Sequence, residues 1–237
     1  MDDPVSVTVD SSSNVWVSEE NNNRVIGFQD PFLFDNKADY LVGQTAWNGN
    51  LANMGNSSPS SFTLSTPSGI FMDQADALWV ADSMNHRVIR FPNPYQMTPQ
   101  ADLVFGQPDM YSQFSNSPSA DNLNSPSDVC RSDFGELFVC DSGNNRVLLY
   151  YEPVNDQTAD KVFGQKDDFT TWDADKGGTI SAQGLDMPVA LDLSYNDILM
   201  VTDNMNGRVL GYYGASDENA DTTADIVYGQ NGRMDTG

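Results

Sequence analysis

Residues 79–89 read WVADSMNHRVI, and this run decides the fold because three variants of it occur elsewhere in the chain. The variants are WVSEENNNRVI at 16–26, FVCDSGNNRVL at 138–148 and MVTDNMNGRVL at 200–210. The arginines of the four runs stand 63, 59 and 62 residues apart. Such a steady period indicates a repeat protein, in which each repeat is one unit of supersecondary structure.

Two further landmarks keep the same period. A proline opens an alternating apolar segment about twelve residues before each run, and an apolar stretch closed by Gly-Gln follows each arginine by roughly twenty residues. Turn residues divide each repeat into four short strands. We therefore predict an all-β fold, a β-propeller of four four-stranded blades. The predicted single domain covers residues 1–237, with blades at 4–44, 67–107, 126–165 and 188–230 and polar linkers between them.

The stretch DSMNHRV at 82–88 resembles the NHL-repeat signature, and the resemblance covers essentially the whole chain in four copies. The longer unit that ends in Val-Phe-Gly-Gln is similar to extended bacterial-type NHL repeats. The resemblance implies a β-propeller, usually of six blades, that serves as an interaction platform or, in some branches, carries a metal-dependent enzyme. The motif is specific for the fold and says little about function.

Four repeats are fewer than the resemblance implies. After the last Gly-Gln, residues 231–234 read NGRM, which looks like the start of another linker between blades. We expect a segment of a longer propeller, for example one of six blades; a four-bladed ring and an assembly of open halves are the alternatives. An open ring would expose apolar blade faces and would therefore self-associate through them.

Each run pairs an acid with the arginine five positions later. An arginine that leaves a turn beside a carboxylate predicts a charge-assisted hydrogen bond within the blade. A catalytic group does not need a copy in every blade, so we interpret these pairs as structural. The predicted pairs are Glu19 with Arg24, Asp82 with Arg87, Asp141 with Arg146, and Asp203 with Arg208.

The chain contains one histidine, His86, and two cysteines, Cys130 and Cys140. The positions equivalent to His86 hold asparagine or glycine, which tolerate left-handed turn geometry, so we predict a turn residue there. A zinc site built from several histidines is excluded. The cysteines are expected on the two inner strands of the third blade as buried free thiols; a disulfide is the alternative if the register places them opposite each other.

The third linker contains DADKGGTIS at 173–181, which partly fits a calcium-binding loop. Such loops place oxygen ligands at positions 1, 3 and 5, a glycine at 6 and a bidentate acid at 12. Positions 1, 3 and 6 fit, but Gly177 stands at position 5 and Gly184 at position 12. A calcium ion that stiffens the loop and a solvated Asp-Gly turn remain the two alternatives. The candidate ligands are Asp173, Asp175, Thr179 and Ser181.

A divalent cation in the central channel is a second candidate. Asp128 and Asp192 are expected near the starts of inner strands, which converge on that channel. Lactonase-like propellers, which are similar in architecture, hold one divalent cation there with Glu, Asn and Asp. Two acids form an incomplete site, so this pattern supports only the alternative function, a metal-dependent lactonase-like or lyase-like enzyme or a fragment of one.

Charge and linkers point to the preferred function. The chain has 34 acidic and 11 basic residues and a net charge of −23, which excludes nucleic acid, and it has no apolar run for membrane insertion. The abundant aspartate suits a salty or calcium-containing medium and favours an extracellular or cell-surface location. Phe114 and Trp172, in long polar linkers, are candidate contact residues. We predict a non-catalytic binding or structural module that recognises a protein or glycan through rim loops.

Overall fold

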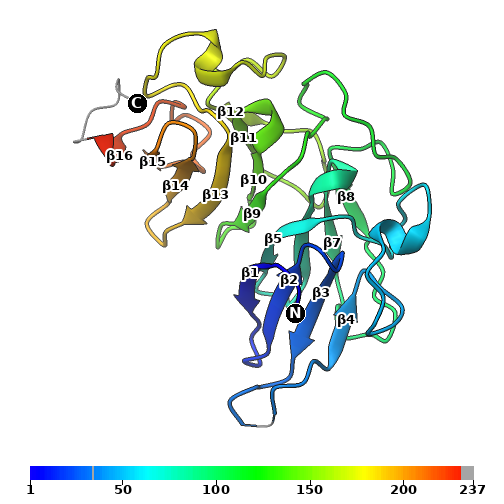
Figure 1. Ribbon diagram of the computed structural model, residues 1–237. Helices are drawn as coiled ribbons and strands as arrows, with labels where there is room; N and C mark the ends of the chain where they lie inside the picture. Colours follow the sequence, from blue (N-terminus) through cyan, green and yellow to red (C-terminus); the bar gives the residue numbers. More distant parts are fainter. Residues whose placement is uncertain (34, 231–237) are drawn as a thin grey trace. The chain divides into compact units, whose positions relative to one another are not determined.

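The short apolar stretches of each repeat are rich in valine, leucine, isoleucine and aromatic residues, which favour pleated strands. They form four four-stranded antiparallel sheets in the computed structural model, which describes residues 1–33 and 35–230 (Figure 1). Strands that follow each other in the sequence pair with each other in every sheet. The prediction of an all-β fold with four four-stranded propeller blades is therefore confirmed.

The chain divides into two compact units, and unit 1, Met1–Phe114, holds blades 1 and 2. The strands of blade 1 are β1 (Pro4–Val9), β2 (Val15–Glu19), β3 (Arg24–Phe28) and β4 (Tyr40–Val42). Those of blade 2 are β5 (Pro67–Met72), β6 (Leu78–Asp82), β7 (Arg87–Phe91) and β8 (Leu103–Phe105).

Unit 2, Ser115–Gly237, holds blades 3 and 4. The strands of blade 3 are β9 (Asp128–Arg131), β10 (Leu137–Asp141), β11 (Arg146–Tyr150) and β12 (Lys161–Phe163). Those of blade 4 are β13 (Pro188–Leu193), β14 (Ile198–Asp203), β15 (Arg208–Tyr213) and β16 (Ile226–Tyr228). That all blades belong to one domain, and to a larger ring, stays a prediction. Residues 231–234 lie outside the described residues.

Short 3-10 helices occur at two kinds of place. Two form the turns that follow β6 and β10, where the repeat reads Asp-Ser-x-Asn; the other two lie in linkers. They are η2 (Ser83–Asn85), η3 (Ser142–Asn144), η1 (Ala52–Gly55) and η4 (Ala174–Gly177). No helix in the described part of the chain is long and apolar enough to cross a membrane.

Each unit is held together by the faces of its two blades. In unit 1, Trp16 is fully buried against apolar side chains of blade 2, and its ring stacks on Tyr40 with centroids 5.3 Å apart. In unit 2, Phe163 of blade 3 contacts Tyr212 of blade 4 edge to face, with centroids 5.0 Å apart. Aromatic side chains thus contribute to the apolar contacts between neighbouring blades.

Candidate functional site

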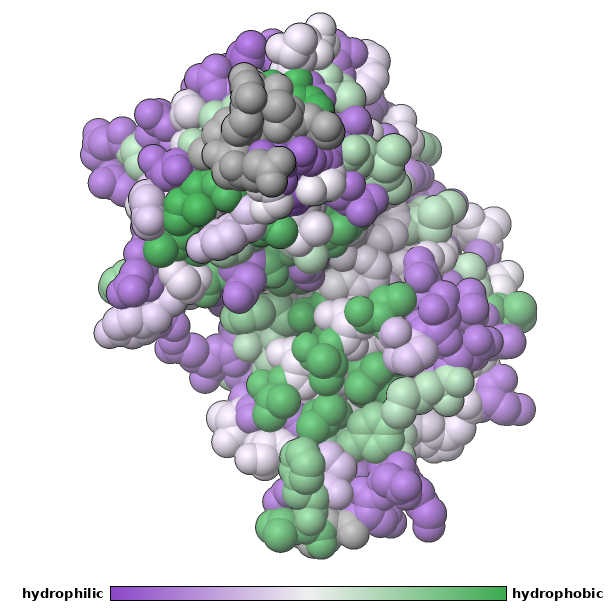
Figure 2. All heavy atoms as spheres, turned by 60° about the vertical axis from the view of Figure 1, so that its left-hand side comes forward, coloured by the Kyte–Doolittle hydropathy of each residue, from purple (hydrophilic) through white to green (hydrophobic). Residues whose placement is uncertain are grey.

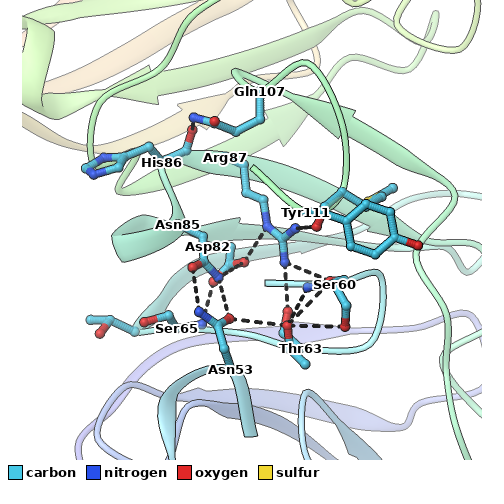
Figure 3. Close-up of polar contacts among 12 residues, drawn as sticks. Asn53, Ser60, Thr63, Ser65, Asp82, Asn85, His86, Arg87, Gln107 and Tyr111 are labelled. Atoms are coloured by element: carbon cyan, nitrogen blue, oxygen red, sulfur yellow. Dashed lines mark hydrogen bonds and ion pairs between the residues drawn. The ribbon is translucent and has the colours of Figure 1, made fainter. Parts of the chain in front are cut away.

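The polar run of blade 2, which recurs in the other blades, forms a buried hydrogen-bond network (Figure 3). Asp82 lies at the end of β6, and its Oδ2 accepts hydrogen bonds from Arg87 Nε and Asn85 Nδ2, both at 2.7 Å. Its Oδ1 accepts a bond from the Ser65 backbone N–H at 2.6 Å. Both side chains of the ion pair are completely buried, so the hydrogen bonds offset their loss of hydration.

The remaining N–H groups of Arg87 hold the linkers on both sides of blade 2 (Figure 3). They donate to the carbonyl oxygens of Met110 at 2.7 Å, Ser60 at 3.0 Å and Thr63 at 2.9 Å. The amides of Asn53 and Asn85 exchange two further bonds of 2.9 Å. Arg87 therefore fixes irregular linkers to a regular sheet, which is a structural task.

The other blades repeat this arrangement. Arg146 and Arg208 donate to Asp141 and Asp203 at 2.7 Å, and both pairs are buried. In blade 1, glutamate replaces aspartate, and Arg24 donates to Glu19 at 2.5 Å. All four predicted ion pairs are present. Their guanidinium groups bond linker carbonyls in every blade, which supports the structural interpretation.

The glutamines of the first three Gly-Gln pairs serve the same purpose, a role that the sequence pattern did not reveal. Gln107 Nε2 donates to the carbonyls of His86 at 3.0 Å and Phe114 at 2.9 Å. In blade 3, Gln165 Nε2 bonds the carbonyls of Asn145 and Asp173 in the same way. The steady spacing of Gly-Gln was the available signal, but the bonded carbonyls lie in turns and linkers whose positions only the fold reveals.

His86 is a turn residue, as predicted. It follows η2 in the left-handed conformation with φ +53°, and its backbone N–H bonds the Ser83 carbonyl. The equivalent residues Asn23, Asn145 and Gly207 also have positive φ, between +51° and +61°. The position selects for left-handed geometry rather than for imidazole chemistry.

The predicted calcium loop is built into unit 2 by the same kind of contact. Asp175 is buried in η4, and its Oδ1 accepts a bond from Asn206 Nδ2 at 2.9 Å, as Asn53 bonds Asn85 in blade 2. The carbonyl of Ser181 accepts a bond from Arg208. Lys176 in this loop donates to Asp168 and keeps the pKa of that carboxyl below its usual value. Calcium binding by Asp173, Asp175, Thr179 and Ser181 stays a prediction.

Asp128 lies on β9 and bridges blade 3 to blade 4. Its Oδ2 accepts a bond from the Leu191 N–H at 2.8 Å, and its Oδ1 accepts one from the Val129 N–H. Burial, together with the nearby charge of Asp192, raises the pKa of Asp128 to about 6. Asp192 itself is exposed. Across residues 1–33 and 35–230, no three acidic, histidine or cysteine side chains are grouped so as to hold a metal ion.

The register of blade 3 settles the state of the cysteines. Cys130 on β9 lies opposite Phe138, and Cys140 on β10 lies opposite Asp128, so the two thiols are diagonal neighbours. Both are free and buried. Burial raises the pKa of Cys140 to about 12 and that of Cys130 well above its ordinary value. The thiols are therefore protonated at neutral pH and poor nucleophiles.

The predicted contact residues Phe114 and Trp172 have exposed side chains, but neither lines a described cavity. Their carbonyls accept bonds from Gln107 and Asn145, which fixes the linker backbone at both places. Recognition through these residues stays a prediction.

Blade 1 carries an exposed apolar face. Val5, Val7 and Val9 of β1 are all exposed, and Figure 2 shows apolar side chains gathered over this blade. An uncovered sheet face of this kind suits another protein surface. Self-association through such faces stays a prediction.

A cleft in unit 2 lies between the hairpin turns that join the inner strands of blades 3 and 4. Its volume is about 510 Å³. Two aromatic side chains at its border, Phe134 and Tyr195, are 89% and 92% exposed. This unit 2 cleft is lined by Arg131, Ser132, Asp133, Phe134, Leu193, Ser194, Tyr195 and Asp197. The cleft was not predicted from the sequence, where the available signal was an aromatic residue in each of the turns DFGE and SYND.

Both turns that form the cleft are braced from within. The Ser132 Oγ accepts bonds from the backbone N–H groups of Phe134 and Gly135 at 3.1 Å, and Arg131 donates to the Gly135 carbonyl. In the other turn, the Asp197 carboxylate accepts bonds from the Ser216 N–H at 3.1 and 3.2 Å. The exposed rings therefore stand on ordered backbone.

The equivalent turns of unit 1 are bonded to each other instead. Ser11 of blade 1 donates through its N–H and its Oγ to the two carboxylate oxygens of Asp76 in blade 2, at 2.9 and 2.5 Å. Counted from the strand ends, Asp133 stands at the position of Ser11 and Asp197 at that of Asp76. Asp133 carries no hydroxyl donor like that of Ser11, and the Asp197 carboxylate accepts its bonds from the Ser216 N–H.

Comparisons with known proteins agree with this architecture. Residues 123–149 match the family model of the NHL repeat. No curated protein matches the chain in sequence. Solved structures match across nearly the whole chain at low identity.

A catalytically inactive variant of virginiamycin B lyase from Staphylococcus aureus is 13% identical, with a TM-score of 0.52 over 90% of this chain and 53% of that chain. Hydrazine synthase from Kuenenia stuttgartiensis is 12% identical, with a TM-score of 0.57 over 95% and 48% of the two chains. Glutaminyl cyclase from Myxococcus xanthus is 9% identical, with a TM-score of 0.50 over 90% and 67%.

This chain spans about half the length of the virginiamycin B lyase chain that it matches. At such low identities the likeness extends to the fold and not to the chemistry of a site. Together with the four sheets and the four buried Arg-carboxylate networks, these matches confirm the resemblance seen in the sequence. Residues 123–149 match the NHL repeat, and the chain is built of four-stranded β-propeller blades.

Proposed function

We propose that this propeller module is a non-catalytic binding module, which recognises a protein or glycan through the hairpin turns at the unit 2 cleft. The observation that carries the proposal is the pair of almost fully exposed rings, Phe134 and Tyr195, on braced turns beside a cavity. Large exposed apolar side chains that border a cavity are typical of ligand sites.

The groups that could serve catalysis are engaged elsewhere. The recurring Asp and Arg side chains bond linkers, and both thiols are buried and protonated. Asp128 lies on an inner strand and has a pKa raised by burial, and its carboxylate accepts two backbone hydrogen bonds. These contacts support a binding role over a catalytic one. An extracellular or cell-surface location, suggested by the acidic composition, is part of the proposal.

Glycan and peptide arrays probed with the purified chain test the proposal. The wild-type chain should give a reproducible set of signals, and the double variant Phe134→Ala/Tyr195→Ala should lose them. Phe62→Ala is the matched control, because Phe62 is a partly exposed ring beside a second cavity, of about 390 Å³, in unit 1. Signals that the double variant retains in full would contradict the proposal.

The alternative function, a metal-dependent lactonase-like or lyase-like enzyme, rests on Asp128 and Asp192. A screen of lactones and esters with added calcium separates the two functions. The proposal predicts no turnover above background. Turnover that EDTA abolishes and that Asp128→Asn or Asp192→Asn removes would replace the binding module with an enzyme.

A further inference from the structure

We propose that the unit 2 cleft binds a neutral saccharide, with a sugar ring held against Phe134 and Tyr195. This inference rests on the proposed function, since it names the ligand class of the same site.

The size of the cleft favours a small ligand. Its volume of about 510 Å³ falls within the range of roughly 300 to 1,000 Å³ that is typical of small-molecule sites. Protein partners meet broader surfaces of roughly 800 Å² on each side. A hollow between two short turns offers room for a few sugar rings.

The aromatic rings supply the apolar half of the recognition. An aromatic ring has a negative face, which attracts groups with partial positive charge such as the C–H groups on one face of a pyranose. Phe134 and Tyr195 come from different blades, so a flat ligand between the turns can reach both. Rings exposed to this extent lose the most water-accessible apolar area when a ligand covers them.

The polar residues that line the cleft provide hydrogen-bond acceptors and determine which ligand charge the cleft favours. Asp133 and Asp197 line the cleft, and carboxylates accept strong hydrogen bonds from hydroxyl groups, which sugars carry in number. The lining holds one cation, Arg131, which donates to the Gly135 carbonyl, against these two carboxylates. The excess of negative charge in the cleft and the net charge of −23 disfavour sulfated or carboxylated sugars. The chemistry therefore selects neutral saccharides.

The bracing of the turns lowers the entropic cost of binding. Ser132 fixes the turn that carries Phe134, and the Ser216 N–H fixes the turn that carries Tyr195 through Asp197. A site whose backbone is already ordered loses little conformational freedom when the ligand arrives.

Titration calorimetry with free sugars tests the inference on the full chain. The probes are methyl glucoside, methyl galactoside, methyl mannoside, N-acetylglucosamine and their β-linked disaccharides. At least one should bind saturably. Phe134→Ala and Tyr195→Ala should each weaken that binding about tenfold, whereas Phe62→Ala should leave it within about twofold. Melting temperatures of the variants, which alter exposed side chains, establish that they are folded.

Each other outcome has a definite meaning. Saccharide binding that survives both ring substitutions would overturn the placement of the site. If no sugar binds, but lysine tripeptides bind and the ring variants abolish that binding, the saccharide inference fails and the proposed function stands. If neither class of probe binds and the arrays are silent, both are overturned.

Discussion

Blades 1 and 2 of unit 1 and blades 3 and 4 of unit 2 are built from one repeat, but two contacts between their inner strands and turns differ. Where unit 1 has Ser6, whose Oγ accepts a bond from the Ile70 N–H at 3.2 Å, unit 2 has Asp128, which accepts one from the Leu191 N–H at 2.8 Å. At the turns, Ser11 bonds Asp76 in unit 1 and the unit 2 cleft takes the place of that contact.

The comparison teaches that the repeat fixes the backbone while side chains at matching positions decide what each pair of blades can do. A neutral serine in unit 1 completes a contact between blades. In unit 2, Asp128 makes the equivalent contact but buries a carboxylate. Asp133, at the position of Ser11, lines a cleft.

The largest effect should come from a feature that the two units share. Arg87→Met in unit 1 and Arg146→Met in unit 2 each leave a fully buried carboxylate without its partner. Each should lower the free energy of unfolding by about 3–5 kcal/mol, measured by urea denaturation followed by circular dichroism. Arg24→Met, where the arginine is partly exposed, should lose less. A large loss of unfolding free energy for one variant and none for the other would contradict the view that the two networks are equivalent.

The second effect concerns the buried acid that distinguishes unit 2. Asp128→Ser supplies the hydroxyl that Ser6 uses in unit 1 and removes the carboxylate whose pKa is raised to about 6. Above pH 6 the folded wild-type chain holds an ionised buried carboxylate, which lowers its stability by about 3 kcal/mol relative to the protonated state. The variant should therefore be more stable than wild type at pH 7.

The sign of the pH dependence follows from proton uptake. Between about pH 4 and pH 6 the folded chain holds a proton on Asp128 that the unfolded chain has released, so wild-type stability rises as pH falls through this window. The advantage of Asp128→Ser should shrink over the same range. Melting temperatures of both proteins from pH 4 to pH 8 measure the difference, and a difference that does not change with pH would contradict the assignment.

A smaller effect is expected at the turns. Asp133→Ser places a hydroxyl donor opposite Asp197, as Ser11 lies opposite Asp76, and should draw the two turns of unit 2 together. Saccharide affinity should fall about fivefold in calorimetry because the cleft narrows. Asp133→Ala removes the carboxylate without supplying a donor and should lose about twofold. Equal losses in both variants would show that closure does not occur.

The smallest expected effect is the lack of reaction of the two buried thiols with a thiol reagent. Cys130 and Cys140 are buried with raised pKa values, so a thiol reagent at pH 8 should label neither in the folded chain and both in urea. Mass spectrometry after a short pulse measures the labelling. Rapid modification of either thiol in the folded chain would contradict the burial described for blade 3.

Much of the fold was predictable because similar residues recur at matching positions in all four repeats. The strands, the ion pairs and the turn at His86 all follow from positions that recur in every blade. The hydrogen bonds from Gln107 to the carbonyls of His86 and Phe114 were not predictable. These two residues belong to segments that approach each other only in the tertiary fold. The cleft was hidden for the same reason, since Phe134 and Tyr195 line one cleft only when neighbouring blades pack.

Two other features depended on details that spacing does not give. The cysteine pair could be judged only once the register placed Phe138 opposite Cys130. Asp175 fitted position 3 of a calcium loop, yet its side chain bonds Asn206 and so repeats a contact made by Asn53 in blade 2. A loop motif shows which residue types are present, whereas their partners depend on the neighbouring blade.

The most direct test of the central claim is an amide NMR titration of the full chain with the sugars named above. The account predicts chemical-shift changes confined to residues 131–136 and 193–197 in unit 2, with the matching turns of unit 1, residues 10–14 and 73–77, unchanged. Shifts centred on the unit 1 turns or on the linker residues Phe114 and Trp172, or no shifts with any sugar, would contradict the claim that this cleft is a saccharide-binding site.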